Sequence, residues 1–353
     1  MALAISSIAV RLAERGLLPE AAVRLGIRRL LRLRLDEAHH QDPEAAAALT
    51  QEFLAGLRAA PLAVLPEQAN AQHYELPPAL FEAMLGPRRK YSCCWWPEGV
   101  DNLAAAEEAA LAETAARAGL ADGQTILELG CGWGSLSLWM AEHLPASEIL
   151  AVSNSASQRA FIEAQALRLG LRNLQVRTAD FSSWGDDGQL DRRFDRIVSV
   201  EMFEHLRNWP RAFRKVSNWL RDDGRFFLHV FAHREAPYAF EVRDATDWMS
   251  RHFFSGGMMP SDDLALLCQD DLALLQRWRW DGRHYARTAA AWLERLDAHR
   301  AELMPVFDRV YGPDDAPMWW QRWRLFLLSV EELFAYDHGQ QWWVSHYLFA
   351  PRR

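Results

Sequence analysis

Between residues 103 and 235, short apolar runs alternate with segments of helical periodicity. The runs TILELG, EILAVS, NLQVRTAD, DRIVSV and RFFLHVFA, which begin at residues 125, 148, 173, 195 and 225, predict strands. The segments that begin at residues 103, 135, 157 and 209 have apolar positions at helical spacing and predict helices. Strands that alternate with helices predict an α/β fold with a doubly wound, parallel sheet.

The pattern differs on both sides of this alternation. Residues 1 to about 60 predict helices, and after about residue 235 the periodicity weakens in a Trp-rich part with expected helices at 287–300 and 319–334. We therefore divide the chain into an N-terminal helical region (1–70), a core (71–235) and a C-terminal part (236–353) that completes the sheet.

One predicted helix near the N-terminus is strongly basic. The stretch VRLGIRRLLRLRL, residues 23–35, carries Arg24, Arg28, Arg29, Arg32 and Arg34 among aliphatic residues. One interpretation is a helix that lies on an anionic membrane. The other is a helix that packs on its own protein with its Arg tips in solvent. The interruption by Gly26 and the acidic balance of the whole chain favour the second interpretation.

Composition narrows the class of protein. The chain has 353 residues, half of them hydrophobic, and a net charge of −8, which argues against nucleic acid as a partner. The four Cys have no zinc spacing, so we expect a reduced, cytoplasmic chain without a metal site. No apolar run is long enough to span a membrane, and we expect no signal peptide. The preference for Arg over Lys, with abundant Ala and Leu, suggests a bacterial genome rich in G and C.

A glycine-rich turn, ELGCGWG, follows the first predicted strand at residues 128–134. Glycines let the backbone turn sharply beside a ligand, and the following helix offers free N–H groups. A dinucleotide fingerprint needs a third glycine where this chain has Ser135, and the second strand ends in AVSNS without the expected acidic residue. These departures argue against a nicotinamide cofactor, and a purely structural turn is the other alternative.

The turn resembles motif I of the class I S-adenosylmethionine-dependent methyltransferases. The resemblance implies a Rossmann-like doubly wound core over residues 71–235 that binds S-adenosylmethionine. In that family the acidic residue, Glu128 here, anchors the methionine end of the cofactor. The glycines Gly130, Gly132 and Gly134 make room for it.

Further segments narrow the resemblance. QHYELP, YSCCWW, FDRIVSVEMFEH, FFSGGMMPS, GRHYARTAAAW and WWVSHYLF resemble the family that joins cyclopropane-fatty-acid synthases to the coclaurine N-methyltransferases, from about residue 70 to the C-terminus. This family places a helical, substrate-covering part over the core, which here is residues 236–353. The resemblance also implies further cofactor-binding residues: Tyr91, Ser92, Ser153, Asn154, Gln158, Asp180 and Phe181.

The two branches of this family differ in chemistry. In the synthases the nucleophile is an acyl-chain alkene, and a bound bicarbonate removes the proton. The bicarbonate-binding positions match Cys93, Glu204, His229 and Tyr285, and a fifth, usually aliphatic, position is Phe231. The synthases typically have VSVGMFEH where this chain has VSVEMFEH, as the N-methyltransferases do. This difference favours an amine substrate.

The residues Glu201, Glu204 and His205 carry the expected chemistry. Their spacing places them on one face if a helical turn follows the strand. A secondary amine is mostly protonated at neutral pH, so a carboxylate can bind it and a histidine can accept its proton. We expect Glu201 to bind the ammonium and His205 to act as base or relay, with Glu204 orienting it. The alternative is that both carboxylates merely suit the start of a helix.

Substrate-binding candidates of second rank are Cys93, His229, Phe231 and Tyr285. Aromatic walls suit a cation or a ring system. The sixteen Trp residues supply candidates for them, among them Trp95, Trp96, Trp319, Trp320, Trp342 and Trp343.

The sequence thus predicts an S-adenosylmethionine-dependent N-methyltransferase of a small aromatic-bearing amine, such as a tetrahydroisoquinoline. The alternative is a cyclopropane-fatty-acyl-phospholipid synthase or another acyl-chain methyltransferase, which would contact a membrane peripherally. A third alternative is a non-catalytic cofactor-binding protein. The oligomeric state is open, with a homodimer as one candidate.

Overall fold

The computed structural model describes residues 2–38, 41–64, 76–185, 190, 193–243 and 247–352, with side chains from residue 8 onward. Most of the QHYELP segment, residues 72–75, lies outside the described residues. In the described part of the chain, no helix has both the length and the apolar content needed to cross a membrane.

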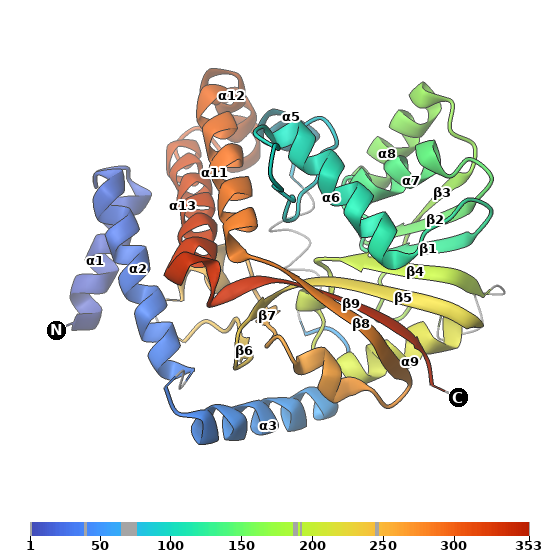
Figure 1. Ribbon diagram of the computed structural model, residues 1–353. Coiled ribbons are helices and arrows are strands. Elements are labelled where there is room, and N and C mark those ends of the chain that lie inside the picture. The colour runs from blue at the N-terminus through green and yellow to red at the C-terminus, as the bar shows by residue number, and fades with distance from the viewer. Residues whose placement is uncertain are drawn as a thin grey trace.

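A seven-stranded sheet forms the centre of the molecule (Figure 1). Its strands are β1 (Thr125–Leu129), β2 (Glu148–Ser153), β3 (Leu174–Thr178), β4 (Phe194–Val200), β5 (Leu220–His233), β8 (Leu272–Trp280) and β9 (Trp342–Pro351). Their order is β3-β2-β1-β4-β5-β9-β8. The five expected strands, β1 to β5, run parallel to one another, which confirms the doubly wound α/β fold.

The sheet is mixed rather than fully parallel, because β9 runs antiparallel to both β5 and β8. These two late strands were not expected individually. They come from the Trp-rich part, so its aromatic residues belong partly to the sheet. A second, two-stranded sheet pairs β6 (Tyr238–Ala239) with β7 (Met258–Met259).

Helices cover both faces of the sheet. On one face, α6 (Leu103–Ala118) and α7 (Ser135–His143) pack in a cluster with Ile126 and Val198. On the other, α9 (Trp209–Trp219) packs in a cluster with Leu127 and Ile197. The alternation of side chains along β1 and β4 thus supplies both cores. The helix α8 (Ala156–Leu169) packs beside β2 and β3.

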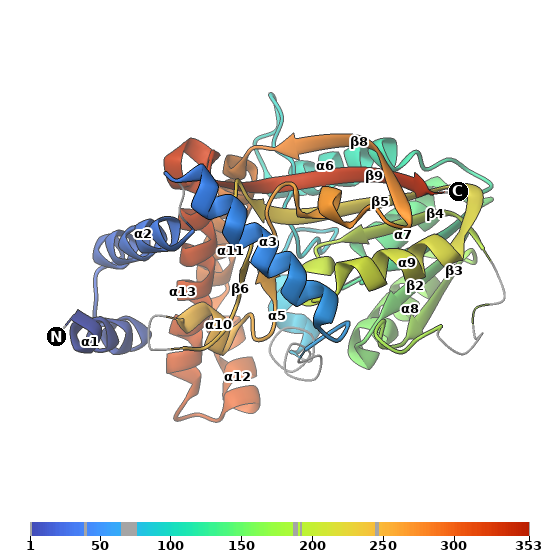
Figure 2. The same cartoon turned by 90° about the horizontal axis from the view of Figure 1, so that it is seen from below.

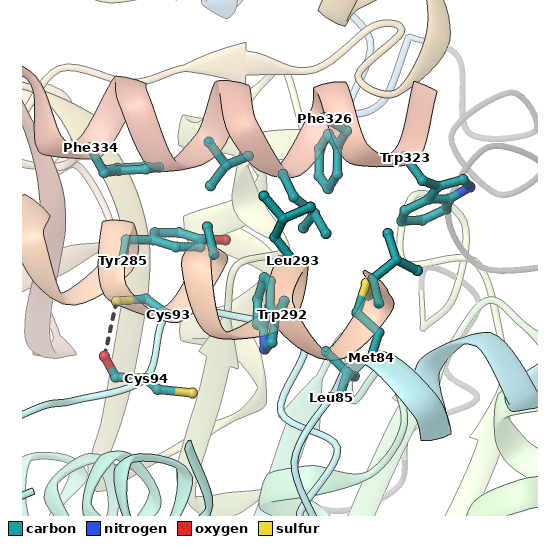
Figure 3. Packing of buried hydrophobic residues seen from close by; sticks show 14 of the residues in the cluster. Met84, Leu85, Cys93, Cys94, Tyr285, Trp292, Leu293, Trp323, Phe326 and Phe334 are labelled. Atoms are coloured by element: carbon teal, nitrogen blue, oxygen red, sulfur yellow. Dashed lines mark hydrogen bonds between the residues drawn. The ribbon is translucent and has the colours of Figure 1, made fainter. Parts of the chain in front are cut away.

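Three C-terminal helices pack with α5 (Pro78–Met84) in an apolar cluster that also includes residues of the sheet: α11 (Gly282–Ala298), α12 (Arg300–Tyr311) and α13 (Ala316–Ala335). The expected helices at 287–300 and 319–334 lie within or near α11 and α13, and α12 was not expected. Figure 3 shows Phe334 of α13 facing Tyr285 of α11, with Phe326 farther along α13 on the side toward α11.

Short elements connect these layers. They are α10 (Trp248–His252) and the three 3-10 helices η1 (Phe203–His205), η2 (Leu264–Cys268) and η3 (Tyr336–Gly339).

The N-terminal region consists of α1 (Ala2–Glu14), α2 (Glu20–Glu37) and α3 (Pro43–Ala59). Arg24 and Arg28 of α2 form ion pairs with Glu332 of α13, at 2.9 and 2.6 Å. The basic helix therefore packs on its own protein, as the second interpretation expected. Figure 2 shows α2 beside α13, with α3 crossing the molecule toward α9, which it contacts.

Candidate active site

The glycine turn after β1 has the backbone conformation that only glycine adopts readily. Gly130, Gly132 and Gly134 have φ angles of 77°, 51° and 79°. A Cβ atom on Gly134 would lie 2.6 Å from Ile162 of α8, whereas a Cβ on Gly132 would meet nothing within 4 Å. The room at Gly134 is thus taken by Ile162, and that at Gly130 by Met202, which would lie 2.5 Å from such a Cβ; of these three glycines, Gly132 borders open space.

Two cavities of about 160 and 90 Å³ lie at the carboxyl ends of the parallel strands. Both are lined by Gly130, Gly132, Gln158, Glu201 and His205. Ligands of doubly wound sheets bind at this edge.

The structure brings together nearly all the residues expected to bind the cofactor. The larger cavity is also lined by Tyr91, Ser92 and Glu128. The smaller is also lined by Ser153, Asn154, Asp180 and Phe181. Of the expected residues, Gly134 is the exception, since it is not among the residues described as lining either cavity.

The polar groups of the larger cavity fit the amino-acid end of S-adenosylmethionine. Burial raises the pKa of Glu128 to about 8, and the Ser137 hydroxyl donates a hydrogen bond to its carboxylate. A buried carboxylate without a cationic partner among the described residues suits a ligand ammonium. The Gln158 amide nitrogen also has no hydrogen-bond partner within the described part of the structure. It offers a donor to a ligand.

Glu201 follows β4 in a left-handed conformation, with a φ angle of 49°. Its Oε1 accepts hydrogen bonds from the Cys93 backbone N–H at 2.9 Å and from His229 Nε2 at 3.0 Å. The Tyr285 hydroxyl donates to Oε2 at 2.7 Å. Cys93, His229 and Tyr285 are three of the four residues that the resemblance associates with bicarbonate. Here their donors hold the carboxylate of the chain itself.

Glu204 has a different environment. Its side chain is fully buried, and the Phe231 backbone N–H donates to its Oε1 at 2.9 Å. It is not among the residues described as lining either cavity. The expected single face is wrong, because the turn after β4 is the short 3-10 helix η1 and Glu201 stands before it. The carboxylate of Glu204 contacts the backbone of β5 instead of orienting His205.

Burial controls the protonation of these groups. It raises the pKa of Glu201, while the charge of Lys90 and the hydrogen bond from Tyr285 act in the opposite direction. It raises the pKa of Glu204 strongly, and the nearby Glu201 charge adds to this effect. Burial lowers the pKa of His205 to about 4, so this imidazole is neutral at neutral pH.

Aromatic rings form much of the wall of the larger cavity, beside aliphatic side chains. The Tyr285 and Phe334 rings stack with centroids 4.3 Å apart (Figure 3), and the His205 ring stacks on Phe254 at 5.4 Å. The wall also includes Phe231, Phe240 and Trp292. Both Phe231 and Tyr285, expected from the sequence, thus border the cavity, whereas Cys93 and His229 lie behind Glu201.

Of the sixteen Trp residues that could supply this wall, the six singled out from the sequence are not among the residues described as lining the cavities. Trp133 and Trp292 are the Trp residues described as lining the cavities. Trp95 stacks on Trp280 with centroids 5.9 Å apart, and Trp343 donates a hydrogen bond to Asp262. Five of the aromatic residues that line the larger cavity are Phe, and among these the sequence singled out Phe231 alone.

Sequence reasoning also missed Lys90. Its side chain is 3% exposed, and its ammonium donates to the Ser92 hydroxyl at 2.6 Å and to the Cys93 carbonyl at 2.7 Å. Lys90 therefore fixes the loop that carries the Cys93 donor. The available signal was its rarity, because the chain has only one other Lys, Lys215.

The sheet, the glycine turn and the paired cavities define a class I methyltransferase that uses S-adenosylmethionine. The family model described as mycolic acid cyclopropane synthetase matches residues 65–341, and the chain belongs to this family.

Individual relatives agree with this assignment. An (S)-coclaurine N-methyltransferase of Thalictrum flavum subsp. glaucum is 34% identical over 343 residues, 96% of this chain and 94% of that protein. The cyclopropane-fatty-acyl-phospholipid synthase of Escherichia coli (strain K12) is 31% identical over 234 residues, 66% of this chain and 57% of that protein. A crystal structure of coclaurine N-methyltransferase bound to N-methylheliamine and SAH superimposes with a TM-score of 0.92, at 34% identity, covering 97% of this chain and 98% of that one. The fold class and the resemblance seen in the sequence are thereby confirmed.

Proposed function

We propose that this enzyme N-methylates a small amine that carries an aromatic ring, of the tetrahydroisoquinoline class. The observation that carries the proposal is the position of Glu201. Its carboxylate lies where the two cavities meet, beside a wall of aromatic rings. A fixed negative charge next to aromatic faces is the environment that binds an organic ammonium.

The cofactor side of the site fits this reaction. When bound, S-adenosylmethionine supplies a methyl group on a sulfonium for in-line displacement. Glu128 and Gln158 would hold its amino-acid end, and the residues around Asp180 its other end. The enzyme's own contribution is to hold the amine nitrogen in line, which converts a bimolecular reaction into an effectively intramolecular one.

Glu201 and His205 divide the work on the amine. The three donors to Glu201 keep its carboxylate in one orientation, so it binds and aligns the substrate ammonium. His205 borders both cavities and is neutral, so a nitrogen of its ring can accept the proton. Burial lowers the pKa of His205, and the negative charge of Glu201 acts in the opposite direction, which favours that transfer and frees the lone pair. Product ammonium is still cationic, and Glu201 also offsets that charge.

The similar proteins support an amine as the substrate. An (S)-tetrahydroprotoberberine N-methyltransferase of Eschscholzia californica is also similar, 31% identical over 322 residues, which cover 90% of this chain and 91% of that protein. Its name and that of the (S)-coclaurine N-methyltransferase describe methylation at nitrogen.

The lipid alternative is disfavoured by a contact. In the synthases the proton acceptor is a bound bicarbonate. Here Cys93, His229 and Tyr285 already hold Glu201. Room for a separate anion on the same donors is therefore lost.

A single labelling experiment separates the two. The protein is incubated with S-adenosylmethionine carrying a deuterated methyl group, and separately with an amine panel and with vesicles of unsaturated, anionic phospholipid. We expect label in tetrahydroisoquinolines and less in the non-aromatic control piperidine, since only the former fills the aromatic wall. Label in the acyl chains and in none of the amines would overturn the proposal.

A further inference from the structure

A chain of hydrogen bonds leads away from Glu201 through the interior of the sheet. His229 of β5 contacts Glu201 through Nε2, and its Nδ1 lies 2.9 Å from Nε2 of His346 on β9. These two histidines are directly paired across the antiparallel strands. Nδ1 of His346 lies 2.8 Å from a guanidinium nitrogen of Arg117, near the end of α6.

The direction of every bond in this chain is fixed by its last member. A guanidinium has N–H groups and no acceptor, so Arg117 must donate to His346 Nδ1. A neutral His346 then carries its proton on Nε2 and donates to Nδ1 of His229. His229 in turn carries its proton on Nε2 and donates to Glu201. The tautomers of both histidines therefore follow from one arginine, which lies three hydrogen bonds away from Glu201.

The surroundings keep both imidazoles neutral. Both side chains are fully buried. Burial lowers the pKa of His229 well below its ordinary value, and the positive charges of Lys90 and Arg117 act in the same direction. Burial, followed by His229 and Arg117, does the same to the pKa of His346.

Arg117 is itself held in place from two sides. Its Nε lies 2.7 Å from an oxygen of Glu113, one turn earlier on α6. Its guanidinium lies over the rings of Trp278 and Trp280, at 5.4 and 5.5 Å from their centroids. Because Arg117 is held in this way, the donor-to-acceptor direction of the hydrogen bonds through the two histidines stays the same.

We infer that Arg117 and His346 are positioning residues that act through His229 to hold the Glu201 carboxylate as a hydrogen-bond acceptor. The inference rests on the proposed function and adds one consequence to it. A proton taken up at the substrate cannot leave through these histidines, because His229 already bears a proton toward Glu201 and Arg117 accepts none. The proton leaves on the cavity side, where His205 lies.

The tautomers can be measured without turnover. The whole protein is labelled with ¹⁵N-histidine, and the two ring systems are assigned by comparison with His346→Gln and His229→Gln. In the wild-type protein, we expect the rings of His229 and His346 both to be neutral and to carry their proton on Nε2. A proton on Nδ1 of either residue, or a charged imidazole at neutral pH, would overturn the inference. A failed amine panel would leave this result unaffected.

Kinetic measurements test whether the hydrogen-bond network from Arg117 acts through Glu201. Arg117→Met removes the donor, and we expect kcat to fall about 10- to 100-fold with little change in KM for S-adenosylmethionine. Arg117→Lys keeps a side chain that donates hydrogen bonds and cannot accept them, so its kcat should be close to that of the wild type. The exposed Arg214→Met, which removes an ion pair with Asp271 elsewhere, is the matched control.

A double-mutant cycle separates this role from general stability. In the Glu201→Gln background, Arg117→Met should cost almost nothing further, because the group it positions has already been altered. Full additivity of the two losses, or a Lys variant as slow as the Met variant, would overturn the role of Arg117.

Discussion

Glu201 and Glu204 stand three residues apart, and the structure treats them in opposite ways. Glu201 has a left-handed backbone, borders both cavities and accepts hydrogen bonds from three donors. Glu204 is fully buried and accepts one bond from the backbone of β5, and its Oε2 has no hydrogen-bond partner within the described residues. The carboxylate of Glu201 has three hydrogen-bond donors and access to the cavities, so it is suited to bind a cation. The carboxylate of Glu204 is not among the groups described as lining the cavities and connects η1 to β5. Sequence spacing alone does not separate these two roles.

Loss of the Glu201 charge should produce the largest effect. We expect Glu201→Gln to lower kcat by about 10²- to 10⁴-fold, since the amine loses both its anchor and its charge partner. Calorimetry should show nearly unchanged binding of S-adenosylmethionine. The exposed Glu163→Gln is the control. A change below about threefold, which is under about 0.7 kcal/mol in the barrier, would contradict the role.

His205→Ala should have the second largest effect and lower kcat/KM by about 10²-fold at neutral pH. The amine substrate loses its proton to solvent as the pH approaches its own pKa of about 10. The deficit in kcat/KM should therefore shrink steadily between pH 7 and pH 10. A deficit that stays constant over this range would show that His205 does not handle the proton.

Tyr285→Phe should have an intermediate effect, about tenfold or less on kcat. The hydroxyl stabilises the Glu201 carboxylate and lowers its pKa. Without it the carboxyl pKa rises further, so the acidic limb of the pH profile should move to higher pH. Tyr311→Phe, outside the cavities, should leave the limb in place. A shift to lower pH in Tyr285→Phe would break the assigned contact.

Glu204→Gln should have the smallest effect on activity, within about threefold. Its effect should appear in stability. Burial raises the folded-state pKa of Glu204 above its unfolded value, so the wild type loses stability as the pH rises above about 4.3. The variant lacks this loss. In thermal unfolding between pH 4 and pH 8, the stability of the variant relative to the wild type should increase with pH. A stability difference that does not grow with pH would contradict a raised pKa of Glu204.

Much of the fold was predictable because its signals are local. The five parallel strands and the helices α6 to α9 follow apolar runs and helical periodicity. The ends of α6 show why, since Asn102 accepts a hydrogen bond from Ala105 N–H and Gly119 has a left-handed conformation. The strands β8 and β9 were harder to foresee, because both pair with partners distant in sequence.

The site was predictable to the extent that a motif fixes a position. The glycine turn and the VSVEMFEH segment led to residues that line the cavities. The contacts of Glu204 with Phe231 and of His229 with His346 depend on how β4, β5 and β9 align, which no local pattern reports. A bacterial origin and a cytoplasmic location stay predictions.

The left-handed backbone at Glu201 has an evolutionary consequence. For a side chain other than glycine this conformation costs about 1 kcal/mol, whereas glycine adopts it freely. The synthases typically have glycine at this position and use bicarbonate as the proton acceptor. Glycine and glutamate codons can differ by one base, and the backbone need not move. A change from a bound anion to the carboxylate of a side chain thus needs a single base substitution, and Glu201→Gly supplied with bicarbonate or formate reproduces in the laboratory the arrangement that the resemblance to the synthases implies.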